Sequence, residues 1–108
     1  MTEEKAFVFY NNIPAGTLLK SETGYSFIYS KDYINKKNNP SISISFPKKK
    51  KIFYSKFLFP FFSGLLAEGT NKEIQCRYFK INEKDYFKRL ITTAETDTIG
   101  AVTIRKNL

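Results

Sequence analysis

The opening thirty residues constrain the fold most, because they predict paired strands before any other feature of the chain is considered. Residues 6–10 are continuously apolar and β-prone, and the pattern resumes over residues 13–20 after Asn11 and Asn12. Asn tolerates the positive φ of a two-residue hairpin turn, so a β-hairpin is predicted here. Pro14 cannot donate to a strand ladder, so either the second strand lies at an edge or a bulge accommodates the proline.

Two further strands are predicted in the first half. After a turn at residues 21–24, aromatic side chains stand at every second position from 25 to 29. Residues 41–46 show the most regular period of two, with Ile42, Ile44 and Phe46 on one face and serines on the other, which predicts a half-buried strand. Between them, residues 31–39 are polar, with a helical turn expected around Tyr33.

The second half is predicted to be helical until its last few residues. Residues 57–66 predict a short buried helix with Pro60 in its first turn, and Gly69 suits the left-handed conformation at its end. Thr70 with Glu73 has the spacing of a capping box for a second helix that runs to about residue 80. A third helix over residues 82–94 is predicted to begin with Asn82 as its cap, and residues 99–104 predict a last strand.

The expected architecture is therefore α+β. A small, mainly antiparallel sheet, formed by a meander and the C-terminal strand, is accompanied by three short helices in the second half. At 108 residues, with 42% hydrophobic and 17% aromatic residues, the chain is expected to form a single domain over residues 1–108.

Composition also bears on location. No apolar run approaches the roughly 20 residues that span a bilayer, and the start of the chain lacks a signal-peptide pattern, so a cytoplasmic protein without membrane contact is expected. Cys76 is the only cysteine and cannot form an internal disulfide, so it is expected to be an inert, partly buried thiol.

The net charge of +8 predicts attraction to an acidic partner. Nucleic acid, a membrane surface and an acidic protein face all qualify. The excess is concentrated near the middle of the chain, where Lys48, Lys49, Lys50 and Lys51 form a basic patch, although such a run is also typical of a solvated loop.

The residue types needed for catalysis are missing. The chain has no histidine and one cysteine, which removes His-based acid/base chemistry and the usual zinc sites. It has no phosphate-binding loop of the Walker type, no nucleophile elbow and no kinase catalytic motif. The carboxylate pairs Glu83 with Asp85 and Glu95 with Asp97 are better explained by helix ends and turns. We therefore expect no enzyme activity, no metal and no cofactor.

Direct binding of nucleic acid or membrane is less well supported. Aromatic residues interleave with lysines over residues 50–54, as in proteins that bind single-stranded nucleic acid. A recognition helix, however, needs basic and amide side chains on its outer face, and residues 71–80 offer mainly Lys72, Gln75 and Arg77. The aromatic stretch beside the lysine run leads into a helix whose apolar side is expected to enter the core, so membrane binding is not expected.

One segment resembles a known family. Residues 60–69, PFFSGLLAEG, resemble the "FF..LLPEG" signature of the N-terminal domain of HipA-type serine/threonine kinases. Leu90 with Ile91, followed by DTIGAV at residues 97–102, is similar to the family's "LL…G.D..GA" segment. The resemblance covers about residues 6–104. Ala67 stands where the family usually has Pro, and Glu95 where it usually has Gly.

The resemblance implies a role in which another protein does the chemistry. Only the non-catalytic lobe of such a kinase is matched, and lone domains of this kind resemble HipS, the small component of split HipBST toxin–antitoxin systems. That implies binding to a HipT-like serine/threonine kinase toxin, with a HipB-like helix-turn-helix protein as a further member, so nucleic acid would be contacted at most indirectly.

The resemblance also suggests where contact occurs. As a hypothesis, a kinase contact loop formed by Ala67, Glu68, Gly69, Thr70, Asn71 and Lys72 projects toward the kinase cleft, although simple helix capping explains the middle residues equally well. The structural turns are assigned to Gly16, Gly24, Asp97 and Gly100.

Three hypotheses follow. The first is a non-catalytic antitoxin or accessory subunit that binds and restrains a separate kinase. The second is a basic nucleic-acid-binding module whose affinity comes from the lysine run and falls strongly with salt. The third is that the chain is the excised N-terminal domain of a full-length HipA kinase.

Overall fold

The predicted N-terminal hairpin is confirmed. In the computed structural model, which describes residues 4–66, 69–93 and 101–106, β1 (Glu4–Tyr10) pairs antiparallel with β2 (Ile13–Ser21). Asn11 and Asn12 form the turn with φ values of 49° and 66°, the left-handed pair that a tight hairpin requires.

A β-bulge accommodates Pro14. The pairing shifts from Val8 opposite Gly16 to Phe9 opposite Pro14, which leaves Ala15 as the extra residue. β2 lies between β1 and β3 (Gly24–Tyr29), so it is not an edge strand. Of the two arrangements left open for the proline, the bulge is the correct one.

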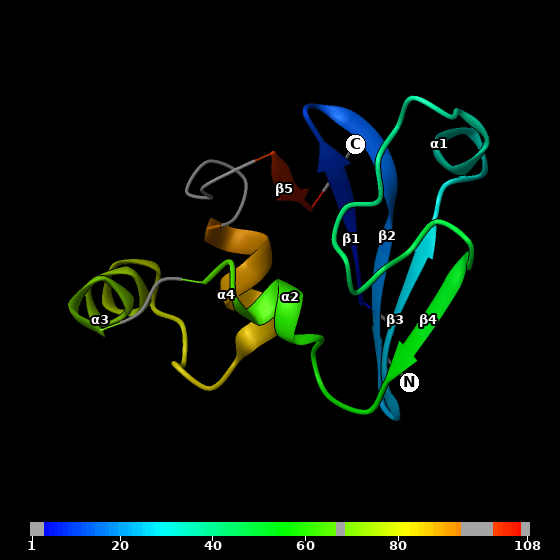
Figure 1. Ribbon diagram of the computed structural model, residues 1–108. Helices are drawn as coiled ribbons and strands as arrows, with labels where there is room; N and C mark the ends of the chain where they lie inside the picture. Colours follow the sequence, from blue (N-terminus) through cyan, green and yellow to red (C-terminus); the bar gives the residue numbers. More distant parts are fainter. Residues whose placement is uncertain (1–3, 67–68, 94–100, 107–108) are drawn as a thin grey trace.

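Five antiparallel strands form the sheet, in the order β4-β3-β2-β1-β5 (Figure 1). β5 (Val102–Arg105) returns from the helical half and pairs with β1, which confirms that the last predicted strand joins the earlier sheet. Residues 99 and 100 of that prediction lie outside the described residues. β4 (Ile52–Ser55) forms the opposite edge.

The predicted strand at residues 41–46 is wrong. Ile42 and Phe46 are buried as expected, but Ile44 is 99% exposed and the segment pairs with no strand of the sheet. The Tyr29 hydroxyl accepts a hydrogen bond from the Ile42 amide (3.0 Å) and donates one to the Phe46 carbonyl, while the Phe46 amide bonds the Ser43 carbonyl (3.0 Å) in a turn. These hydrogen bonds take the place of strand pairing for residues 41–46, and the fourth strand along the chain is β4 instead.

The helices in the described residues are α1 (Lys31–Asn35), α2 (Pro60–Ser63), α3 (Gly69–Phe79) and α4 (Tyr86–Thr93). α3 covers nearly the range predicted for the second helix, whereas α2 is shorter than predicted and α4 begins later than predicted. The expected helical turn at Tyr33 is α1, and α2 covers only the centre of the range predicted for the first buried helix.

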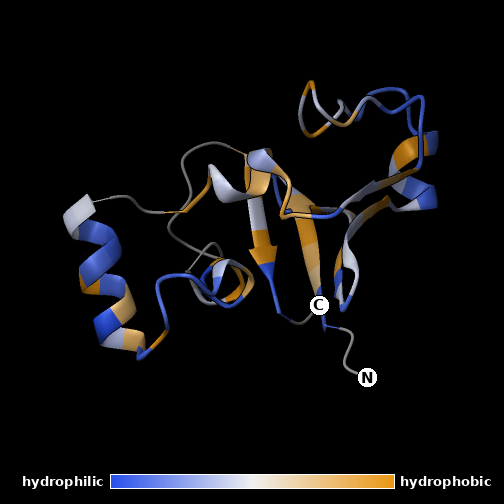
Figure 2. Ribbon diagram, turned by 90° about the horizontal axis from the view of Figure 1, so that it is seen from below, coloured by the Kyte–Doolittle hydropathy of each residue, from blue (hydrophilic) through white to orange (hydrophobic). Residues whose placement is uncertain are grey.

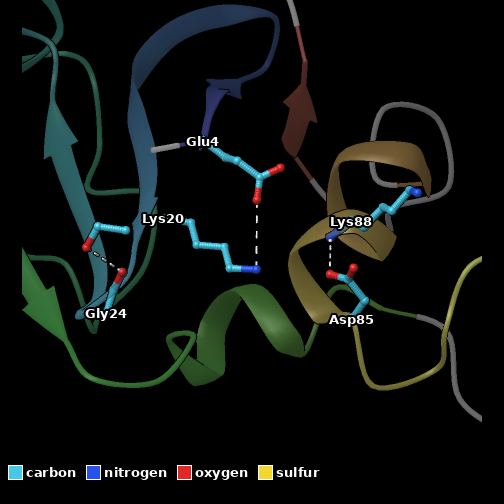
Figure 3. A network of polar contacts seen from close by, with 6 residues as sticks. Glu4, Lys20, Gly24, Asp85 and Lys88 are labelled. Carbon is cyan, nitrogen blue, oxygen red and sulfur yellow. Dashed lines mark hydrogen bonds and ion pairs between the residues drawn. The ribbon is translucent and has the colours of Figure 1, made fainter. Parts of the chain in front are cut away.

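Asp85, rather than Asn82, caps α4. Its carboxylate accepts a hydrogen bond from the Lys88 amide (3.2 Å; Figure 3). Asn82 instead accepts one from the Lys84 amide (2.8 Å) in the preceding turn. Figure 3 also shows the ion pair between Lys20 of β2 and Glu4 of β1 (3.8 Å).

The core lies on one face of the sheet, against α2, α4 and the segment that joins α1 to β4. Phe46 is its centre, with ring centroids 5.0 Å from Phe27, 5.1 Å from Phe59 and 5.5 Å from Phe62. Phe87 and Leu90 of α4 are buried in the same core, whereas Tyr86 is exposed. In Figure 2, α3 has largely hydrophilic colours and stands away from the strands, which contain orange, hydrophobic segments.

Candidate partner-binding surface

The predicted kinase contact loop coincides with the start of α3. Gly69 has a φ of +59° and opens the helix, and Thr70 and Asn71 are exposed beside it. Lys72 lies 3.6 Å from the Glu83 carboxylate, which ties this first turn to the segment before α4. Ala67 and Glu68 lie outside the described residues. The four described residues of the predicted loop, 69–72, are therefore accessible on one side and anchored on the other.

α3 itself presents most of its surface outward. It stands at the end of the molecule beyond β5 (Figure 1), and Cys76 is its only buried side chain. Ile74 and Tyr78 lie one turn apart on the helix and are 60% and 79% exposed. The sequence predicted the helix but not this exposed apolar pair, because a single sequence does not distinguish a core-facing residue from a partner-facing one.

Cys76 is a free thiol buried on the inner side of α3. Beside it, an open hollow of about 570 Å³ lies between α3 and the turn at residues 81–84. The burial of Cys76 agrees with the burial predicted for it, and its low reactivity stays a prediction.

The four lysines of the basic patch do not act together. The Lys48 ammonium group donates to the carbonyls of Lys36 (2.8 Å) and Asn39 (2.6 Å) and lies over the Tyr33 ring. It therefore holds the segment after α1 in place. Lys49, Lys50 and Lys51 are exposed, so the accessible basic patch consists of these three residues.

The turn assignments have mixed outcomes. Gly24 ends the tight turn between β2 and β3, where the Ser21 hydroxyl donates to its carbonyl (3.2 Å; Figure 3). Gly16 lies within β2 instead, where an added Cβ would lie 2.9 Å from the Phe27 ring and even closer to the Ile28 carbonyl. Gly16 is therefore required for close packing against β3. Asp97 and Gly100 lie outside the described residues.

A second hollow, of about 370 Å³, opens where the end of β4 approaches α2 and α4. Arg89 lines it and is nearly buried. Its guanidinium group donates to the Glu83 carbonyl (3.2 Å) and faces the Tyr86 ring. The remaining lining is largely apolar and aromatic, and comprises Tyr25, Phe57, Leu58, Ser63, Leu66 and Tyr86.

Among the described residues, no group of His, Cys, Asp and Glu could hold a metal ion. The perturbed titrations belong to core tyrosines, since burial raises the pKa of Tyr29 and raises the pKa of Tyr33 to about 12. No helix in the part of the chain that the structure describes is long and apolar enough to span a membrane.

The fold defines a small α+β domain with one packed sheet face and a projecting helix. The family model described as the HipA N-terminal domain matches residues 6–105. The chain belongs to the HipA N-terminal domain family, which confirms the resemblance read from residues 60–69. This domain is distinct from the kinase catalytic domain.

Two individual relatives agree. An uncharacterized protein of Haemophilus influenzae (strain KW20/Rd) is 34% identical over 91 residues, which cover 84% of this chain and 81% of that protein. A solved structure described as the N-terminal domain of HipA toxin superposes with a TM-score of 0.71 at 24% identity, covering 100% of this chain and 97% of that one. The second match supports the fold.

Proposed function

We propose that this chain is a HipS-like, non-catalytic antitoxin or accessory subunit that binds a separate HipT-like serine/threonine kinase in the cytoplasm and restrains it. A HipB-like helix-turn-helix protein would complete a three-component assembly. In this proposal the domain supplies contacts, and the partner supplies the chemistry.

One observation carries the proposal. The family match runs over residues 6–105, and the Haemophilus influenzae relative is itself covered over 81% of its length by the alignment. That relative is therefore a small protein with no room for a kinase catalytic body. When a domain of this family is made without the catalytic domain, any contact between the two is a contact between separate molecules.

Separation of the two parts sets a physical requirement. A contact that is intramolecular in a one-chain kinase becomes bimolecular, so the interface itself must supply the affinity. Exposed apolar side chains beside polar ones are typical of such interfaces, and α3 offers Ile74 and Tyr78 next to the proposed contact segment. The positive charge of the chain favours an acidic face on the kinase.

The direct test is co-expression with a HipT-like kinase that carries the purification tag. We expect co-purification, suppressed autophosphorylation and restored growth. Absence of a complex, together with unchanged toxicity, would refute the proposal.

A matched pair of variants tests the role of α3. Tyr78→Ser removes an exposed aromatic from α3, and Ile44→Ser removes an exposed apolar side chain from the loop between α1 and β4. We expect Tyr78→Ser to weaken the kinase complex by roughly tenfold or more, as for a central interface aromatic, and Ile44→Ser to leave it unchanged. Equal effects would argue against contact through α3.

Two alternatives remain as competing proposals. The exposed Lys49, Lys50 and Lys51 favour a nucleic-acid-binding module, which would require binding of DNA or RNA that weakens steeply with salt and disappears when these lysines are replaced. The other alternative, an excised piece of a full-length HipA kinase, is tested by the length of the open reading frame.

A further inference from the structure

β4 forms a free edge of the sheet. It pairs with β3 on one side only, and none of the other described strands lies against its second side (Figure 1). An edge strand presents unpaired backbone amides and carbonyls, which another chain can pair with. The free edge of β4 is therefore a place where an extended segment can extend the sheet.

The direction of its backbone groups follows from the ladder. The Tyr29 amide donates to the Lys51 carbonyl (2.9 Å), so this facing pair is hydrogen-bonded. Hydrogen-bonded and non-bonded pairs alternate in an antiparallel ladder, and Ile52 opposite Ile28 and Tyr54 opposite Ser26 are therefore non-bonded pairs. The amides and carbonyls of Ile52 and Tyr54 consequently point away from β3, toward the free side.

The side chains along this edge divide between the two faces. Ile52 and Tyr54 lie on the face opposite the core and are 54% and 60% exposed. Phe53 points to the core face, where the Lys50 ammonium group lies 5.4 Å from the centre of its ring. Lys51 shares the core face with Phe53, two residues away along the strand. The outer face of the edge therefore carries two exposed apolar side chains, and the core face carries half-buried Phe53 with Lys50 and Lys51 at the start of the strand.

This division specifies the occupant. An added strand places alternate side chains on the two faces, so a complementary strand carries apolar residues opposite Ile52 and Tyr54 and acidic residues on the face of Lys50 and Lys51. We infer that the free edge of β4 is a second binding site, for an extended segment of a partner protein in which acidic and apolar residues alternate.

A second copy of this chain fits less well. Antiparallel self-pairing would bring together two copies of residues 50–56, which hold Lys50, Lys51 and Lys56 and no acidic residue, so the lysines would repel one another rather than find partners. Nucleic acid would satisfy the lysines but would not pair with the outward backbone groups. The edge lies at the end of the sheet away from α3, so it adds to the proposed kinase contact rather than replacing it.

The probe is a short, capped peptide in which Glu and Val alternate, with a matched peptide of alternating Lys and Val as the control. Both are titrated into the isotope-labelled full chain and followed by the amide resonances. We expect saturable binding of the acidic peptide, with the Ile52 and Tyr54 amides shifting most and becoming protected from hydrogen exchange.

Two variants at one position separate backbone pairing from side-chain contact. Ile52→Pro removes an outward amide while leaving the β3 pairing, since edge strands tolerate proline where the amide faces solvent. Ile52→Ala keeps the amide. We expect Ile52→Pro to weaken binding of the acidic peptide by roughly tenfold or more, and Ile52→Ala to weaken it by less than about threefold. Thermal unfolding confirms that both variants are folded.

Three outcomes would overturn the inference. They are equal binding of the acidic and basic peptides, Ile52→Pro binding as wild type, and a DNA duplex shifting the lysine amides while the acidic peptide shifts neither Ile52 nor Tyr54. None of these depends on the kinase, so the proposed antitoxin function stands or falls separately.

Discussion

The Tyr29 hydroxyl is predicted to be the main polar anchor of the segment between α1 and β4. It accepts from the Ile42 amide (3.0 Å) and donates to the Phe46 carbonyl, and all these groups are buried. The substitution Tyr29→Phe keeps the ring, which packs against Phe27 with centroids 4.9 Å apart, and removes only the oxygen. It therefore leaves two buried backbone groups without these partners.

The cost follows from those two groups. Each buried polar group that loses its partner costs about 1–3 kcal/mol, so the free energy of unfolding is expected to fall by about 2–6 kcal/mol. With an m-value of about 2 kcal/mol/M in urea, the midpoint shifts by roughly 1–3 M. The Ile42 amide should also lose protection from hydrogen exchange, because its bond is to this hydroxyl.

The assay is urea unfolding followed by circular dichroism, with Tyr78→Phe as the matched control. Tyr78 is exposed on α3, so removal of its hydroxyl is expected to change stability by less than about 0.5 kcal/mol. A Tyr29→Phe protein as stable as this control would refute the reasoning and would mean that water or a rearranged segment replaces the lost bonds.

Two other predictions concern the packing of the sheet and the pH dependence of stability. Gly16→Ala places a methyl group against the Phe27 ring and the backbone of β3, so we expect a loss of about 1–3 kcal/mol in urea unfolding, and an unchanged midpoint would contradict the close approach. Tyr33 keeps its proton to a pKa of about 12 when folded, whereas an unfolded tyrosine ionises near its ordinary value of about 10. The stabilisation contributed by the protonated Tyr33 hydroxyl is therefore complete below about pH 10 and declines as pH rises toward about 12. The stability difference between wild type and Tyr33→Phe should shrink by about 1 kcal/mol between about pH 8 and about pH 11. Because the lysines titrate in both proteins, a constant difference would refute the assignment to Tyr33.

Features set by neighbouring residues were predictable from the sequence. The turn at Asn11 and Asn12 follows from the tolerance of Asn for positive φ, and both residues adopt it. Pro14 required either an edge or a bulge, and the bulge at Ala15 is one of those two arrangements. These predictions held because each depends on backbone preferences that act over a few residues.

Features set by distant contacts were not predictable. The alternation over residues 41–46 is as regular as in a strand, yet the hydroxyl of Tyr29 provides backbone partners that replace a ladder. Asn82 and Asp85 are both good caps by residue type, and the turn between them leaves Asp85 at the start of α4. Lys48 belongs to a lysine run, and only its bonds to two carbonyls reveal a packing role.

The candidate site shows the same division. The basic composition of the lysine run before β4 was evident in the sequence. Which side chains of β4 lie on which face of the sheet, however, depends on the pairing of Ile52 with Ile28, which no local pattern specifies. The exposed pair on α3 likewise depends on which side of that helix turns toward the core, where Cys76 lies.

Stability and binding capacity are separated along the sheet. The aromatic cluster around Phe46 holds the central strands, α2 and the loop after α1 together, whereas the exposed lysines and apolar side chains lie at β4 and α3, near the two ends. Substitutions more than about 7–10 Å apart with no shared partners act nearly independently, so surface changes at these ends should alter binding without unfolding the core. If the proposed function holds, this separation lets the domain bind a separate partner at its ends without loss of the packing that keeps it folded.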